Sequence, residues 1–155
     1  MAQYEYGERI GKTARISPGC SALIFDLTGQ KILLTRRTDN GRWCLPGGRM
    51  DPGESIEETC VREVWEETGL HVRVVKLLGL YSSPHFIIKY ADGNRWQVFS
   101  VSFQAEVTGG ELGLSDETTE AGYFTLEEIE QMDVMDSHRV RIKDALEHPE
   151  GGLFK

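Results

Sequence analysis

The sequence predicts an α/β fold in which helices flank a mixed β-sheet. Its 155 residues are a typical length for one domain, and 39% of them are hydrophobic, enough to build one core. Segments typical of strands and of helices follow one another without strict alternation, which favours a mixed sheet over a doubly wound parallel sheet. We therefore expect a single domain over residues 1–155, with a core of about residues 15–147.

Short apolar runs bounded by turn residues predict the strands. Residues 20–26 and 31–36 flank a glycine-containing turn and are expected to form two joined strands, whereas residues 43–48 (WCLPGG) resemble an irregular loop. Residues 96–107 alternate between apolar and polar side chains and predict a strand in the centre of the sheet. Further extended segments are expected at residues 72–80 and 123–124. An acidic loop is expected between them, at residues 114–120.

The clearest helix spans Ser55 to Thr68. Ser55 and Glu58 have the spacing of a capping box, and Gly69 can adopt the left-handed conformation that ends a helix. Two further helices are expected at residues 126–132 and 137–147. The apolar residues available to the core in the last helix are Val140, Ile142, Ala145 and Leu146.

Three glutamates share a narrow arc of the first helix. At about 100° per residue, Glu66 and Glu67 lie about −60° and +40° from Glu63, and an apolar stripe runs beside them. The stripe consists of Ile56, Cys60 and Val64. Carboxylates at these spacings repel one another, and Arg62 alone cannot neutralise them. A hard divalent cation such as Mg²⁺ or Mn²⁺ can, although a glutamate triple by itself is also typical of a solvated acidic surface.

The segment Gly48 to Leu70, GRMDPGESIEETCVREVWEETGL, extends this pattern. Glu54 follows Gly48 after five residues, and Arg62-Glu63-Val64 follow after seven more. Glu66-Glu67 and then Gly69-Leu70 complete it, each pair after one further residue. This segment resembles the signature of the Nudix hydrolases at all nine fixed positions, and a chance match is on the order of 10⁻⁷. The order of the surrounding elements is also similar to the α/β/α sandwich of that family.

The resemblance implies an enzyme of phosphoric anhydride bonds that hydrolyses a nucleoside diphosphate linked to another moiety with the help of Mg²⁺ or Mn²⁺. It implies that Glu63 and Glu67 are metal ligands and that Gly48 offers its backbone carbonyl to the metal. Glu66 is implied as a ligand or as the base that activates water. Metal ions suit this chemistry because they neutralise pyrophosphate charge and lower the pKa of water.

The resemblance also implies roles for residues other than the metal-binding glutamates of the helix. Glu54 and Arg62 are expected to orient the loop and the helix. Residues 115–124 are similar to a loop of family members that carries a further carboxylate, which points to Glu117 as an extra ligand or base and to Glu120 second. A solvated acidic loop is the alternative for both residues.

Other candidate residues carry weaker signals. Arg36 and Arg37 follow the second strand and can face phosphates, although exposed arginines are common on any surface. Four aromatic residues are candidates for stacking on a base, or else for the core or its rim. They are Trp43, Tyr81, Phe86 and Trp96. The four histidines lack metal-ligand spacing, and only His85 is set apart, by its position in a loop.

The amino-acid composition narrows the classes of binding partner. Seventeen basic and 25 acidic residues give 17 − 25 = −8, which disfavours a protein that wraps a nucleic acid polymer. The three cysteines have no C-x-x-C spacing, so we expect reduced thiols and a cytoplasmic protein, and no apolar run is long enough to enter a membrane. The expected partner is a small-molecule nucleotide. A homodimer is compatible with the family, but no apolar stripe requires one.

Three functions remain distinguishable. The first is a pyrophosphohydrolase acting on a nucleoside triphosphate or an ADP-ribose-like compound. The second is a nucleotide-sensing module of the same fold without catalysis, which the intact glutamate pattern disfavours. The third is removal of a 5′ diphosphate from RNA, which the net charge and the lack of a basic cluster disfavour.

Overall fold

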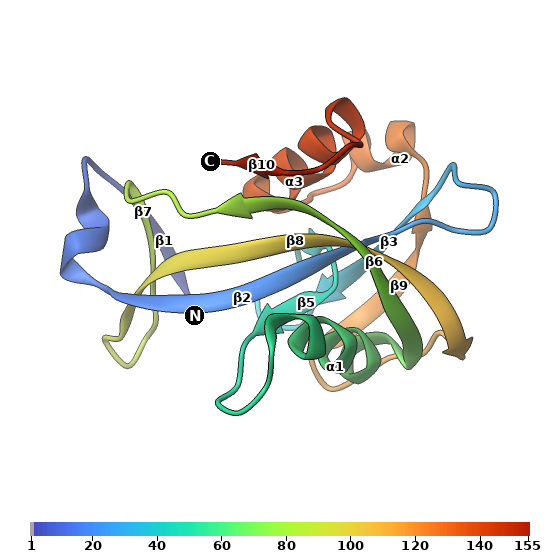
Figure 1. Ribbon diagram of the computed structural model, residues 1–155. Coiled ribbons are helices and arrows are strands. Elements are labelled where there is room, and N and C mark those ends of the chain that lie inside the picture. Colours follow the sequence, from blue (N-terminus) through green and yellow to red (C-terminus); the bar gives the residue numbers. More distant parts are fainter. Residues whose placement is uncertain (1) are drawn as a thin grey trace.

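The computed structural model describes residues 2–155, which form two β-sheets enclosed between helices (Figure 1). In the larger, seven-stranded sheet the strand order is β1-β7-β8-β2-β5, with β6 beside β8 and β10 beside β6; the smaller sheet has the order β4-β3-β9. The strands are β1 (Gln3–Tyr6), β2 (Arg15–Ile24), β3 (Ile32–Arg37), β4 (Trp43–Cys44), β5 (Gly47–Arg49), β6 (Leu70–Tyr81), β7 (Phe86–Lys89), β8 (Arg95–Gly110), β9 (Thr118–Phe124) and β10 (Leu153–Phe154). The helices are η1 (Ile10–Thr13, a 3₁₀ turn), α1 (Ile56–Thr68), α2 (Leu126–Gln131) and α3 (Asp136–Glu147).

The larger sheet is mixed, as the sequence predicts. Strand β2 runs parallel to β8, from the pair Arg15 and Trp96 to the pair Ile24 and Ala105. Strand β8 also pairs antiparallel with β6 and β7, while β2 pairs antiparallel with β5. Strand β8 is therefore the central strand that its alternating pattern predicts.

Two apolar cores lie on opposite sides of β2, because successive side chains of a strand point to opposite faces. Ala22 and Ile24 pack in one core with Cys60 and Val64 of α1. Leu23, between them, packs in the other core with side chains of α2 and α3. Burial of a side chain such as Val64 or Leu23 contributes roughly 1.5–3 kcal/mol. The result is the predicted α/β/α sandwich, with α1 on one side and α2 and α3 on the other (Figure 1).

Both ends of α1 form as the sequence predicts. The Ser55 hydroxyl accepts a hydrogen bond from the Glu58 amide at 3.1 Å, and the Glu58 carboxylate accepts one from the Ser55 amide at 3.3 Å. Gly69 ends the helix with a φ of +76°. A Cβ at Gly69 would lie 2.6 Å from the carbonyl oxygen of Glu111, so the close loop also requires glycine.

The two strands joined by the first turn lie in different sheets. Phe25 and Ile32 form an isolated antiparallel bridge at the turn. Beyond that bridge both edges of β2 are occupied, by β5 and β8, so β3 pairs with β4 and β9 instead. The turn is as predicted, but the strands do not continue as one hairpin.

Several segments differ from their prediction because non-local pairing overrides local pattern. Residues 43–48, expected as a loop, include the short strands β4 and β5. The expected acidic loop ends early, since β9 begins at Thr118 and pairs with β3. Strands β1, β7 and β10 were not predicted, and two of them extend the sheet beyond the expected core of about residues 15–147.

The inner face of α3 also differs from its prediction. Ile142 and Ala145 are buried, as expected, but Val140 and Leu146 are 43% and 39% exposed. Arg141 and Asp144 are buried in their place. The buried face of this helix thus carries two charged residues that the apolar pattern does not reveal.

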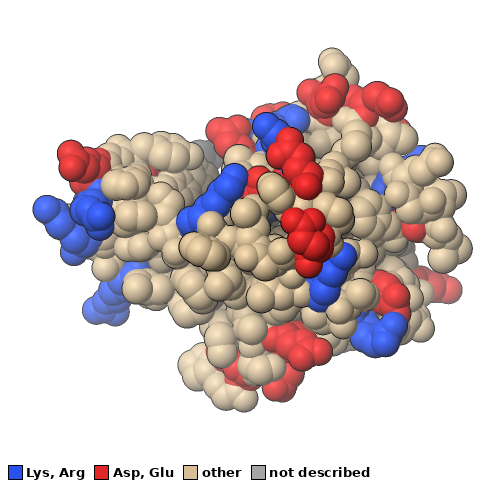
Figure 2. All heavy atoms as spheres, turned by 45° about the horizontal axis from the view of Figure 1, so that its top comes forward, with Lys and Arg blue, Asp and Glu red and all other residues tan. Residues whose placement is uncertain are grey.

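Charges of both signs are interspersed on the face of the molecule shown in Figure 2. This face therefore lacks a continuous basic surface. Among residues 2–155, no helix combines the length and the apolar character needed to span a lipid bilayer.

Candidate active site

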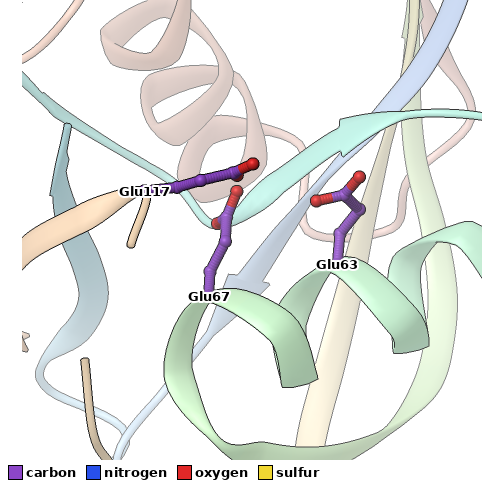
Figure 3. Close-up of side chains that lie close together, drawn as sticks. All are labelled: Glu63, Glu67 and Glu117. Atoms are coloured by element: carbon purple, nitrogen blue, oxygen red, sulfur yellow. The ribbon is translucent and has the colours of Figure 1, made fainter. Parts of the chain in front are cut away.

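Three carboxylates converge at the side of α1. Glu63 and Glu67 lie one turn apart on the helix, and Glu117 directly precedes β9 (Figure 3). One carboxylate oxygen from each residue lies within 4.8 Å of the other two. We call these three residues the carboxylate cluster. Hard divalent cations prefer such oxygen ligands, so the cluster is a candidate metal centre.

Hydrogen bonds hold the Glu117 loop against α1. The Thr118 hydroxyl donates to the carbonyl oxygen of Glu67 at 3.1 Å, and the Thr38 amide donates to the carbonyl oxygen of Glu117 at 3.1 Å. The Glu117 amide in turn donates to the Ser115 hydroxyl at 3.2 Å. The first of these bonds joins residues 51 positions apart in the sequence.

Burial and mutual repulsion raise the pKa values of two cluster members. Burial raises the pKa of Glu67 to about 8, with Glu63 and Glu117 adding to the effect, although the Gly47 amide donates to Glu67 at 3.1 Å and opposes it. Burial also raises the pKa of Glu63, and the neighbouring Arg62 opposes that shift. A bound cation would relieve both causes, because it pairs with the charged form of each carboxylate.

Two glycines let β5 lie between β2 and α1. A Cβ on Gly48 would overlap the carboxylate of Glu63, and a Cβ on Gly47 would overlap the backbone of Cys20. Gly19 on β2 is equally close, since its Cβ would lie 2.6 Å from the carbonyl oxygen of Gly48. Gly48, expected as a carbonyl donor, is thus directly beside the cluster.

Arg62 connects the loop before α1 to the acidic side chains on it. Its Nε and Nη2 donate to Glu54 at 2.9 and 2.7 Å, and Nη2 also donates to the carbonyl oxygen of Arg49 at 3.0 Å. Its Nη1 donates to Glu63 at 3.0 Å and to Glu66 at 3.1 Å. The guanidinium lowers the pKa of Glu54 to about 2. Glu66 therefore pairs with Arg62 beside the cluster and is not one of its three converging carboxylates.

The expected arginines have different surroundings. Arg36 donates to Glu120 at 2.7 Å, which removes both residues from the cluster. Arg37 forms a two-point ion pair with Asp39 at 2.8 and 2.7 Å. Unlike Arg36, Arg37 lines the cavities next to the cluster, so it is the arginine placed to face a substrate.

Two cavities meet at this place. One, of about 260 Å³, is lined by Glu67, Glu117 and Arg37. The other, of about 150 Å³, lies between the larger sheet and α3; Gly48, Arg37 and Arg141 are among its lining residues. We call the second cavity the α3 pocket. Because Arg37 lines both cavities, the α3 pocket adjoins the cavity beside the cluster.

A model of the NUDIX domain family matches residues 16–146. The chain belongs to the Nudix family. The fold, the signature and the match agree, so the protein is a Nudix hydrolase, an enzyme that acts on phosphoric anhydride bonds.

Relatives of this Nudix hydrolase include proteins with named activities. An ADP-ribose pyrophosphatase of Methanocaldococcus jannaschii is 40% identical over 124 residues, 78% of this chain and 69% of the relative. A Bacillus subtilis (strain 168) protein named for diphosphatase activity on 8-oxo-dGTP is 42% identical over 93 residues, 60% of this chain and 55% of the relative. The crystal structure of an ADP-ribose pyrophosphatase from Streptococcus suis 89-1591 superimposes with a TM-score of 0.70 at 26% identity, covering 90% of this chain and 98% of that chain.

The aromatic candidates of the Nudix hydrolase separate into two groups. Phe86 and Trp96 line the α3 pocket, and the guanidinium of Arg49 lies 4.5 Å from the Trp96 ring centre. Trp43 instead packs edge-on against Phe124. Tyr81 donates a hydrogen bond to Asp144 at 2.9 Å, and the ring of His85 accepts one from the Arg9 amide at 2.9 Å.

Sequence reasoning missed the α3 side of the pocket. Ser137, His138 and Arg141 line it, each from α3. His138 Nδ1 accepts a hydrogen bond from the Leu45 amide at 3.1 Å, and burial holds the pKa of His138 well below its usual value. The ring is therefore neutral near pH 7, with its proton assigned to Nε2. The signal that could reveal these residues is the pair of charged side chains, Arg141 and Asp144, on the buried face of α3.

Proposed function

We propose that this Nudix hydrolase uses Mg²⁺ or Mn²⁺ to hydrolyse a nucleoside diphosphate linked to another moiety, either a nucleoside triphosphate or an ADP-ribose-like compound. The observation that carries the proposal is the convergence of Glu63, Glu67 and Glu117 within 4.8 Å, beside a cavity that Glu67 and Glu117 line. In a chain of net charge −8, such a site attracts a phosphate substrate only when a cation reverses its local sign.

The residues present fit a divalent metal ion. Glu63, Glu67 and Glu117 would hold it, and the carbonyl of Gly48 is the fourth candidate ligand. All of these donors are oxygens, which Mg²⁺ and Mn²⁺ prefer. Burial and the neighbouring carboxylates raise the pKa of Glu67, and a cation would favour its charged form. When bound, the ion would supply Lewis acidity and neutralise pyrophosphate charge.

The remaining steps belong to the protein. We assign Glu117 either as the third carboxylate ligand or as the group that accepts the proton from the attacking water, because it is exposed to solvent while facing the other two carboxylates. Glu66 is the second candidate, since its side chain lies on the same helix face and is 48% exposed. Arg37 is placed to donate to phosphate oxygens between the two cavities.

The relatives support both substrate classes, because one is named for ADP-ribose and another for 8-oxo-dGTP. A sensing module without catalysis is the second candidate function, but the complete set of acidic residues disfavours it. We expect a small-molecule substrate and not a nucleic acid polymer. A cytoplasmic location is consistent with Cys20, Cys44 and Cys60, which are all free thiols.

The test is hydrolysis of a panel of about twenty nucleotide diphosphate compounds with Mg²⁺, Mn²⁺ or EDTA, with each product identified. Glu67→Gln should reduce turnover more than about 100-fold without unfolding the protein, because loss of a ligand exceeds the usual effect of losing a supporting residue. Glu57→Gln is the matched control, since Glu57 is exposed on the same helix. Full activity of Glu67→Gln would refute the assigned role, and metal-dependent nucleotide binding without product would favour the sensing module.

A further inference from the structure

Arg141 is a buried cation without a counter-charge. The residue is 8% exposed, and its Nε has no hydrogen-bond partner among residues 2–155. The ion pairs found within that range all involve other residues. One face of the guanidinium lies over the Tyr81 ring, 5.5 Å from its centre. Burial of an unpaired polar group is costly, so we expect the guanidinium of Arg141 to donate to a molecule outside the chain.

The surroundings of Arg141 in the α3 pocket are rich in hydrogen-bond donors. The side chains that line the pocket include three arginines, one histidine and several serines, but no carboxylate and no amide. His138 presents a neutral ring whose Nδ1 is already used by Leu45, which leaves Nε2–H as a donor. A ligand that fits this wall must therefore offer acceptors.

The rest of the pocket suits a flat ring. Apolar and aromatic side chains form its other walls, among them Leu45, Phe86, Val98 and Met135. An aromatic wall binds a base by stacking, whereas it offers no hydrogen bond to a phosphate.

We propose that Arg141 is a specificity-determining residue that donates two hydrogen bonds to the O6 and N7 acceptors of a 6-oxopurine base, so that guanine is preferred over adenine in the α3 pocket. The assignment rests on the proposed function, in which the carboxylate cluster takes the phosphates and leaves the pocket to the nucleoside. Arginine recognises this pair of acceptors bidentately, whereas adenine presents an amino donor at the same position and is recognised by asparagine or glutamine. Neither of those side chains lines the pocket.

The direct test uses nucleosides in EDTA, because they need neither a metal nor hydrolysis. Calorimetry and intrinsic fluorescence, to which Trp96 in the pocket contributes, should show guanosine and inosine binding at least about 10-fold more tightly than adenosine. 7-Deazaguanosine, which lacks N7, should lose most of that advantage. Equal binding of guanosine and adenosine, or no detectable binding of guanosine, would overturn the proposal. So would tighter binding of inorganic phosphate, since the site would then recognise an oxyanion.

A substitution then connects the preference to Arg141. Arg141→Gln should abolish the preference for guanosine and shift it toward adenosine, and Lys143→Gln on the exposed side of α3 should leave it unchanged. Circular dichroism and thermal unfolding establish that both variants fold; we expect no loss of stability in Arg141→Gln, because it removes an unpaired buried charge. An unchanged preference in folded Arg141→Gln would contradict the assignment.

The two proposals fail in different ways. Guanosine preference without hydrolysis of any nucleotide would refute the proposed function and leave the role of Arg141 intact. Hydrolysis without base preference would do the reverse.

Discussion

The carboxylate cluster and the α3 pocket are neighbouring sites with opposite chemistry. Glu63, Glu67 and Glu117 gather negative charge that Arg62 and Arg37 offset in part, whereas the pocket a short distance away gathers arginines without any acid among its lining side chains. The first site therefore suits a cation, and the second suits a ligand that offers acceptors. Under our two proposals, the chemical step and the recognition of the base are assigned to different groups of residues. Variants of Gly48, which borders both sites, of Arg62, which supports the cluster, and of Glu67, which titrates, can test that separation.

The largest effect is expected at Gly48, which borders both sites. Gly48→Ala should reduce activity at least about 100-fold, because the added Cβ overlaps the carboxylate of Glu63 and displaces a predicted metal ligand. Steady-state kinetics and cation binding by calorimetry measure the change. Gly113→Ala is the control, since a Cβ at that position meets nothing within 4 Å. If Gly48→Ala keeps wild-type cation affinity, Glu63 does not depend on this close approach.

A smaller effect is expected at Arg62, which supports the cluster without lining the α3 pocket. Arg62→Lys should reduce activity or cation affinity about 10–100-fold, because one ammonium group cannot reproduce the fork that joins Glu54, Glu63 and Glu66. Nucleoside binding in EDTA should be unaffected. The exposed pair of Arg73 and Glu106 provides a control in Arg73→Lys. A change in base preference caused by Arg62→Lys would show that the two sites are coupled.

The smallest effect concerns how the free energy of unfolding depends on pH when no metal is bound. Because the pKa of Glu67 is raised to about 8, the folded protein holds a proton between pH 6.5 and 8 that the unfolded chain has released. The free energy of unfolding should therefore fall as pH rises through this window, on the order of 1 kcal/mol. His138 opposes this trend weakly near pH 6.5, because its ring is still partly protonated in the unfolded chain and is neutral when buried.

Denaturant unfolding in EDTA measures the slope, and Glu67→Gln should remove it. Excess Mg²⁺ should reduce the slope as well, since a cation favours the charged carboxylate. A slope that is the same in wild type and in Glu67→Gln would show that another group titrates.

The first site was predictable because its determinants are local. Ser55, Glu58 and Gly69 define the ends of α1, and the helical repeat then places Glu63 and Glu67 on one side. Glu117 came only from resemblance. Its position depends on Thr118 and Thr38, whose hydrogen bonds cross between distant segments and leave no periodic signal.

The second site was not predictable from apolar pattern. At about 100° per residue, Arg141, Ile142, Asp144 and Ala145 span an arc of α3 from about 40° to 200° relative to Val140, and that arc is the buried one. Counting apolar residues alone selects Val140 and Leu146, which flank the arc. The pairing of β2 with β8 and the packing of α3 over the sheet bring this arc to the pocket, and both depend on contacts across most of the chain.

Strand β2 fixes the distance between the two strands that pair with it near Gly19. Gly19 pairs with Arg49 of the signature loop on one side and with Ser100 of the pocket floor on the other. Neighbouring strands keep a spacing of about 4.8 Å, so neither side can shift without breaking the ladder. Under the two proposals, the backbone of β2 therefore fixes the spacing between the loop that precedes the metal-binding helix and one wall of the base pocket.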